Sequence, residues 1–100
     1  MAGAAVFDSP EARRLLEAVC LIGSVDEAAA VLSDLCTPKE VAELAQRLEM
    51  ACLLDAGEPY LSVCERTGGS STTVSRVSKC LNGARGGYRL VLSRMDDAQE

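Results

Sequence analysis

Hydrophobic residues recur every three or four positions through most of this chain, which is the spacing of amphipathic α-helices. Capping signals divide this pattern into segments. Ser9 precedes Pro10, and an S-x-x-E box stands at 24–27. A second box, T-P-x-E at 37–40, opens the longest segment, and Gly23 and Gly57 close the first and the longest. The pattern predicts helices over about 10–22, 28–35 and 38–56.

The longest of these predicted helices is apolar on more than one side. Leu53 and Leu54 extend its main stripe around the helix surface. A helix this apolar is expected to be buried on more than one side. The main stripe consists of Val41, Leu44, Ala45, Leu48, Ala51 and Cys52.

Two shorter amphipathic segments follow, separated by Gly68 and Gly69. The second has one narrow apolar stripe, with Val74, Val77 and Leu81 at i, i+3 and i+7. The first carries the apolar residues Leu61, Val63 and Cys64. The rest of the second segment consists of small hydroxyl side chains and two cations: Ser71, Thr72, Thr73, Ser75, Arg76, Ser78 and Lys79.

A short helix with an apolar back and a small, hydrogen-bonding, cationic front fits the major groove of DNA. Gly68 supplies a residue that tolerates positive φ in the turn, and Ser70 or Ser71 can cap the second helix. The range 58–82 therefore predicts a helix-turn-helix. The alternative is a helical hairpin whose polar face is simply solvated.

The C-terminal part begins with Asn82-Gly83, a helix-ending signal, and a flexible basic connector. We expect a last helix over 87–95, with Leu90, Val91 and Met95 facing inward. Because the pattern of Tyr88–Leu92 is short and mixed, an extended conformation stays open. The range 96–100 is expected to be a frayed acidic tail.

The composition favours one all-α domain over residues 1–100. Hydrophobic residues make up 48% of the chain but only three residues are aromatic, so the core must consist of small aliphatic side chains and cysteine, which suits close helix packing. No run approaches the roughly 18 apolar residues of a membrane span, and the N-terminus has no signal-peptide pattern. We expect a cytoplasmic protein without a membrane partner.

Catalytic and metal-binding signals are missing from the sequence. There are five cysteines in no C-x-x-C pair and no histidine, which excludes the usual mixed zinc sites. We interpret the cysteines as small hydrophobic residues in a reducing compartment, and Cys36, Cys52 and Cys64 as buried. No nucleophile elbow or phosphate loop is present, so we expect neither an enzyme nor a bound cofactor.

The net charge of −5 is unusual for a DNA-binding protein, but the charge is segregated. Residues 1–60 contain four cations and eleven carboxylates. Residues 61–95 contain six cations and one carboxylate, a local net charge of +5. Because phosphate binding depends on local cations, an acidic body with one basic stretch can orient the molecule on DNA.

The ordered residues from 34 to 92 resemble the Trp repressor superfamily, and within it the YerC/YecD type. The resemblance covers over half of the chain and fixes the register of the helix-turn-helix. It is carried by Leu35-Cys-Thr-Pro38, Leu44-Ala-Gln-Arg-Leu48, Thr67-Gly68, Thr73-Val-Ser-Arg-Val77, Cys80-Leu-Asn82 and Gly86-Gly-Tyr-Arg-Leu-Val-Leu92.

This resemblance implies a bacterial transcription regulator with about six helices. It implies an interlaced homodimer in which the helices of 9–57 form the dimer interface and each subunit presents one helix-turn-helix to double-stranded DNA. The regulator is expected to be a repressor, although the sequence does not distinguish repression from activation. The alternative is a dimeric protein-interaction module whose degenerate helix-turn-helix does not bind DNA specifically.

The resemblance also implies a pocket for a small corepressor. The matching positions are Thr37, Arg47, Thr73 and Arg76, whose two arginines could hold an aromatic or carboxylate ligand. Val77 stands where the tryptophan-binding member has glycine, so tryptophan itself is disfavoured and the identity of any effector stays open. The residues expected to contact DNA are Ser71, Thr72, Thr73, Arg76, Lys79, Arg85 and Arg89.

Overall fold

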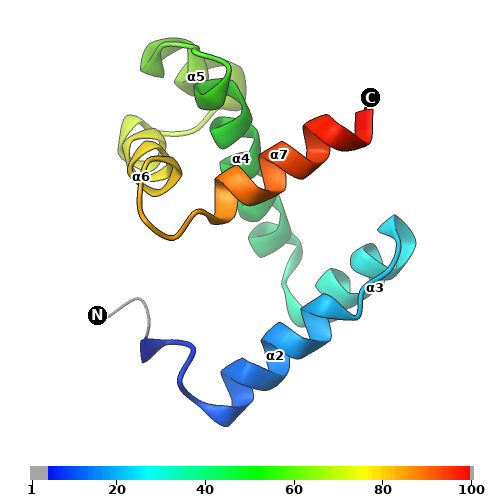
Figure 1. Ribbon diagram of the computed structural model, residues 1–100. Coiled ribbons are helices and arrows are strands. Elements are labelled where there is room, and N and C mark those ends of the chain that lie inside the picture. The colour runs from blue at the N-terminus through cyan, green and yellow to red at the C-terminus, as the bar shows by residue number, and fades with distance from the viewer. Residues whose placement is uncertain (1–4, 100) are drawn as a thin grey trace. The chain divides into compact units, whose positions relative to one another are not determined.

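The computed structural model describes residues 5–99 and is all-α (Figure 1). Each helix predicted from the sequence is present, and no strand occurs among the described residues. The prediction of about six helices is therefore confirmed. The helices are α2 (Pro10–Cys20), α3 (Val25–Leu35), α4 (Pro38–Asp55), α5 (Tyr60–Thr67), α6 (Ser71–Leu81) and α7 (Gly87–Gln99).

The chain forms two compact units, Met1–Thr37 and Pro38–Glu100. We call them the N-terminal unit and the C-terminal unit. The N-terminal unit contains α2 and α3, and the C-terminal unit contains α4 to α7. The longest helix, which the sequence groups with the dimerisation helices, thus belongs to the same compact unit as the helix-turn-helix.

The helices of the N-terminal unit start at the predicted caps. Ser9 Oγ accepts a hydrogen bond from the Ala12 amide at 3.0 Å, and Ser24 Oγ accepts one from the Glu27 amide at 3.1 Å. The Glu27 carboxylate in turn accepts from the Gly23 amide at 2.8 Å. Two otherwise unpaired amides at the start of α3 are therefore satisfied by side chains, which is why this short helix begins at Val25.

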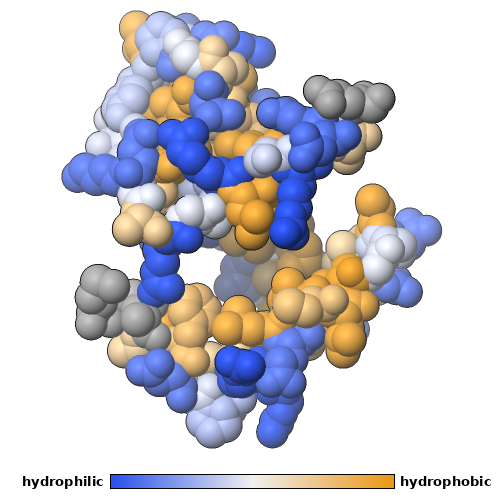
Figure 2. All heavy atoms as spheres, viewed as in Figure 1, coloured by the Kyte–Doolittle hydropathy of each residue, from blue (hydrophilic) through white to orange (hydrophobic). Residues whose placement is uncertain are grey.

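No side chain on α2 or α3 is fully buried, although both helices are amphipathic. On α2, Leu15 is 45% exposed and Val19 is 52% exposed. On α3, Leu35 is 60% exposed. Figure 2 shows hydrophobic surface along these two helices. The N-terminal unit thus has helical structure without a core of its own.

The C-terminal unit has a core built on the second half of α4. This helix contacts α5, α6 and α7, and α6 also contacts its two neighbours in sequence (Figure 1). The apolar stripe predicted on α6 is confirmed, since its three residues are at most 3% exposed. The core consists of Met50, Ala51, Leu53, Val63, Val74, Val77, Leu81 and Leu92.

The turn between α5 and α6 uses its two glycines differently. Gly68 has φ of 74°, in the left-handed region, and its amide donates to the Cys64 carbonyl to end α5. Gly69 provides space instead, because a Cβ atom there would lie 2.0 Å from the Cε atom of buried Met50. The Gln46 amide group also donates to the Thr67 carbonyl at 3.0 Å. The turn is therefore held against α4 at two points.

Ser70 caps α6, as the sequence predicted for Ser70 or Ser71. Its Oγ accepts a hydrogen bond from the Thr73 amide at 3.2 Å. On α5, Leu61 is 71% exposed, whereas Val63 is fully buried. The helix is only two turns long, so a single stripe through Val63 and Cys64 faces the core.

The C-terminal segment is a helix, and the extended alternative is excluded. α7 continues to Gln99, so Asp96 to Gln99 are helical rather than frayed; Glu100 lies outside the described residues. The inward side was predicted wrongly. Leu92 is 6% exposed, while Leu90, Val91 and Met95 are 51%, 44% and 39% exposed. The helix turns Tyr88 and Leu92, spaced i and i+4, toward the core.

All five cysteines are free thiols. Cys36, Cys52 and Cys64 are half-buried, whereas Cys20 and Cys80 are exposed. Burial raises the pKa of the Cys52 thiol, and the nearby carboxylates of Glu49, Asp55 and Asp96 raise it further. Among the helices of residues 5–99, none has the length and apolar character needed to cross a bilayer.

Candidate nucleic-acid interface

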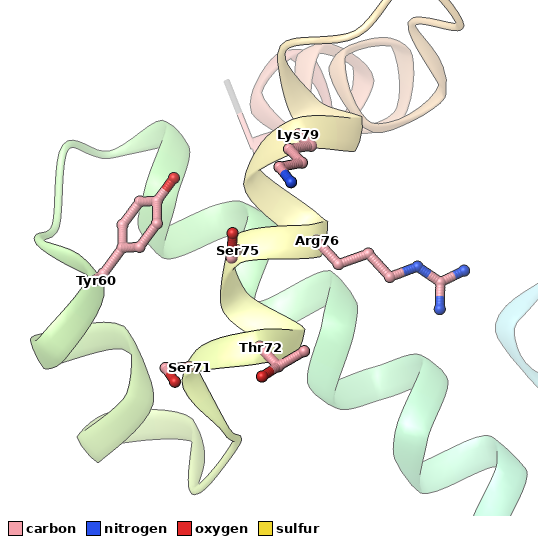
Figure 3. Close-up of a pocket in the computed structure, with 6 residues that line it drawn as sticks. All are labelled: Tyr60, Ser71, Thr72, Ser75, Arg76 and Lys79. Atoms are coloured by element: carbon pink, nitrogen blue, oxygen red, sulfur yellow. The ribbon is translucent and has the colours of Figure 1, made fainter.

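The front of α6 borders an open hollow of about 580 Å³ within the C-terminal unit. Five of its lining residues come from α6 and one comes from the first turn of α5 (Figure 3). In Figure 3 the ring of Tyr60 lies beside α6, and the Arg76 side chain extends away from the opposite side of that helix. The lining residues are Tyr60, Ser71, Thr72, Ser75, Arg76 and Lys79.

Four of the seven predicted DNA-contact residues line this hollow: Ser71, Thr72, Arg76 and Lys79. All four are exposed. Thr73, a fifth predicted contact, is half-buried and does not line the hollow. Its hydroxyl oxygen lies 3.0 Å from Ser70 Oγ, beside the cap of α6. The structure thus brings together the four residues that α6 presents on successive turns, and it turns Thr73 toward the start of the helix.

The other two predicted contacts, Arg85 and Arg89, lie elsewhere in the C-terminal unit. Arg85 lines a separate apolar groove between α4, α6 and α7. Arg89 donates to Asp55 and to the Asn82 side chain, at 3.0 Å in each case. Because Arg89 links the ends of α4 and α6 to α7, its position is better explained by packing than by a shared surface with Arg76.

Two members of the hollow, Tyr60 and Ser75, were not among the predicted contacts. Ser75 belongs to the polar front predicted for α6. Tyr60 carried a usable signal, because it is one of only three aromatic residues and stands in the first turn of α5. Its hydroxyl donates to Ser78 Oγ, and Ser78, expected on the exposed front, is only 9% exposed.

The electrostatics of the hollow are positive. No carboxylate is among its six lining residues. Within the described chain, neither Arg76 nor Lys79 forms a salt bridge, whereas Arg13, Lys39, Arg66 and Arg89 each pair with a carboxylate. Two uncompensated cations spaced one turn apart can attract phosphates, and the hydroxyls between them can donate or accept hydrogen bonds.

The suggested effector residues are divided between the two units. Thr37 ends the N-terminal unit, whereas Arg47, Thr73 and Arg76 belong to the C-terminal unit. Arg47 is half-buried on α4 and is not among the residues that line the α6 hollow. Val77 is 1% exposed and belongs to the core. Among residues 5–99, no group of acidic, cysteine or histidine side chains could hold a metal ion.

Comparisons with known proteins give one consistent result. The family model described as Trp repressor protein matches residues 11–96. The YerC protein of Bacillus subtilis strain 168, itself uncharacterised, is 35% identical over 89 residues, which span 89% of this chain and 86% of YerC.

Two solved structures are also similar. A TrpR-like protein from Eubacterium eligens has a TM-score of 0.84 at 34% identity, covering 90% of this chain and 93% of that chain. A candidate Trp repressor from Staphylococcus aureus has a TM-score of 0.84 at 29% identity, covering 90% of each chain. The fold and the order of helices are therefore shared over most of both chains.

Proposed function

Because the chain belongs to the Trp repressor protein family, we propose that it is a sequence-specific DNA-binding transcriptional regulator, a repressor in the simplest case. Two copies would each place α6 in the major groove. The observation that carries this proposal is the front of α6, where Arg76 and Lys79 stand among three hydroxyl side chains without a carboxylate. A solvated hairpin would not require this segregation in a chain whose net charge is −5.

The residues of the hollow have different roles in this proposal. Thr72, short and near the start of α6, contacts base edges directly or through ordered waters, which can carry sequence specificity in protein–DNA interfaces. Arg76 makes a bidentate contact to guanine or grips a phosphate. Lys79 contacts the phosphate backbone of the DNA, which fixes the register of the protein on the duplex without reading its sequence. Ser71 supports the backbone contact, and Arg85 and Arg89 are secondary candidates.

We further propose that the functional unit is a homodimer. The apolar faces of α2 and α3 are exposed in the single chain, including Leu15, Val19 and Leu35 at 45%, 52% and 60%. A second subunit that covers these faces would give the N-terminal unit the core it lacks. An interlaced arrangement would also set the spacing between the two α6 helices, which must match successive major grooves.

An effector other than tryptophan is compatible with this proposal. Val77, in the position that the resemblance gives to glycine, fills core space at 1% exposure. We expect L-tryptophan to leave DNA affinity unchanged. If millimolar tryptophan increased the affinity for DNA tenfold or more, this expectation would be wrong. That result would support a tryptophan pocket at Thr37, Arg47, Thr73 and Arg76.

The test of the proposed function is binding-site selection with the purified full chain, followed by titration at several salt concentrations. Arg76→Ala is expected to weaken binding to the selected site by about 1–3 kcal/mol. Lys79→Ala is expected to weaken binding to all sequences alike and to lower the salt slope by about one. Ser33→Ala, an exposed substitution on α3, serves as the control.

The competing function is a dimeric protein-interaction module without specific DNA binding, which the acidic net charge favours. The two functions are distinguished by measuring whether the wild-type protein binds a heterologous DNA duplex in a salt-dependent way, which only the regulator should do. If no duplex is bound even at low salt, the regulator proposal is wrong and the interaction module remains.

A further inference from the structure

Tyr60 occupies a place in the α6 hollow that neither charge nor helix pattern explains. Its side chain is 49% exposed and comes from α5, whereas the other lining residues come from α6 (Figure 3). A tyrosine that only filled space would be expected to hide its ring. Here the ring borders the hollow, and its hydroxyl reaches the second helix of the helix-turn-helix.

The partner of that hydroxyl is unusual for a surface tyrosine. Ser78 is only 9% exposed, and the Tyr60 hydroxyl donates to its Oγ. The contact joins residues 18 positions apart, on the two helices of the motif. It therefore fixes the direction of the Tyr60 side chain relative to the front of α6, which a hydrogen bond to water would not do.

The chemistry of two paired hydroxyls allows a third partner. Each hydroxyl has one donor and two acceptor positions, and its hydrogen rotates. If Ser78 donates to Tyr60, the Tyr60 hydrogen becomes available to an incoming acceptor while the bond between the two residues is kept. A phosphodiester oxygen is the acceptor that a duplex would present beside Lys79, which lines the same hollow.

The charges around Tyr60 do not oppose a phosphate. The nearest carboxylate in sequence, Glu58, is paired with Arg66 at 2.8 Å and accepts a hydrogen bond from Ser62 at 3.0 Å. Lys79 lines the same hollow as Tyr60. The Tyr60 hydroxyl therefore stands where a cation is available and the neighbouring acid is already compensated.

We propose that Tyr60 is a phosphate-contact residue: oriented by Ser78, its hydroxyl donates a hydrogen bond to a phosphodiester oxygen of the duplex that α6 reads. Ser78 is a positioning residue that does not touch the DNA. This inference rests on the proposed function, and it adds a second helix, α5, to the DNA-contact surface. The contact carries no sequence information, because every duplex presents the same oxygen.

The test is Tyr60→Phe in the full chain, which removes one oxygen and keeps the ring. Affinity is expected to fall about three- to tenfold, and equally on a selected site and on an unrelated duplex. The salt slope should stay unchanged, since a neutral hydroxyl releases no counterion. The matched control is Tyr88→Phe, because Tyr88 is the other tyrosine of the chain and lines a different groove.

A structural role would give a different result. If removal of the hydroxyl displaced α6, the contacts of Arg76 and Lys79 would be lost as well, and the salt slope would fall. A loss confined to the selected site would assign Tyr60 to a base instead of a phosphate. Either result overturns the proposal, as does wild-type affinity in Tyr60→Phe.

The role of Ser78 is tested by a double-mutant cycle. Ser78→Ala is expected to weaken binding about two- to threefold when Tyr60 is present and to have no effect in the Tyr60→Phe background. Equal losses in both backgrounds would mean that Ser78 acts independently of the hydroxyl. If the wild-type protein binds no duplex, the proposed function itself is wrong; if it binds and Tyr60→Phe binds equally well, only the role of Tyr60 is wrong.

Discussion

The two units of this chain show that forming helices and forming a core are separate problems. The N-terminal unit has two well-capped helices and no fully buried side chain on either of them. The C-terminal unit buries Met50, Val63 and Val74 completely around a helix-turn-helix. Capping is satisfied by neighbours in sequence, whereas burial requires another surface. The first unit has complete local capping signals but no core of its own.

The two units should therefore respond differently to substitution. Changes in the C-terminal unit should act on a core that one chain already has. Changes on the apolar faces of the N-terminal unit should act only where a second subunit covers them. The cost of a substitution thus depends on which unit contains it and, for the N-terminal unit, on the oligomeric state.

The largest effect is expected from Val19→Asp on α2. Val19 is 52% exposed in the single chain, so a carboxylate there is tolerated unless a partner covers it. In the proposed dimer, an unpaired buried charge would cost about 3–5 kcal/mol at each of the two copies. Sedimentation should then show a monomer at micromolar concentration.

The matched control for that prediction is Arg13→Ala on the polar face of the same helix. Arg13 pairs with Glu17 at 3.3 Å, and both side chains are exposed, so its loss should leave the dimer intact. An intact dimer in Val19→Asp would remove the apolar face of α2 from the interface.

The next effect is expected from Met50→Ala in the C-terminal unit. Met50 is fully buried beneath the turn at Gly69, so truncation should lower the free energy of unfolding by about 2–5 kcal/mol. Urea denaturation followed by circular dichroism measures this loss. A change below about 1 kcal/mol would mean that the core relaxes around the cavity, and the contrast between the units would weaken.

A smaller and equal effect is expected at one cap in each unit. Ser24→Ala and Ser70→Ala each remove a side-chain acceptor for a helix amide and should cost about 1 kcal/mol. The part of the chain that opens more readily should differ between the two variants. Hydrogen exchange should show faster opening confined to α3 for Ser24→Ala and spread through the C-terminal unit for Ser70→Ala, because only α6 is part of a core.

The smallest effect concerns thiol reactivity and leaves stability unchanged. Cys20 is exposed, whereas the pKa of the Cys52 thiol is raised by burial and by neighbouring carboxylates. Since the thiolate is the reacting form, Cys52 should be alkylated slowly near neutral pH and need a higher pH to react. Cys20 directly follows Val19 at the end of α2, so the proposed dimer should protect it and Val19→Asp should restore its reactivity. Fast labelling of Cys20 in the wild-type dimer would contradict this interface.

Much of the fold was predictable because its signals are local. The caps at Ser9, Ser24 and Ser70 and the turn at Gly68 lie within a few residues of the groups they satisfy. The stripe on α6 was equally clear, since one face of an 11-residue helix must meet the core.

The inward face of α7 could not be predicted in the same way. Four apolar side chains within 90–95 offer more than one stripe, and the choice of Leu92 depends on where α4 and α6 place their own side chains. The α6 hollow was predictable only in part for the same reason. Tyr60 enters it through a contact with Ser78 across 18 residues, a distance at which sequence spacing carries no information.

The packing of Gly69 against Met50 has a consequence for how related sequences can vary. Gly68 is needed for its backbone conformation, and asparagine is the residue that could replace it with least strain. A Cβ atom at position 69 would instead require the terminal methyl group of Met50 to shift. Positions 50 and 69 should therefore change together during divergence: a relative with a side chain at 69 should carry a shorter residue at 50, whereas position 68 should vary independently of both.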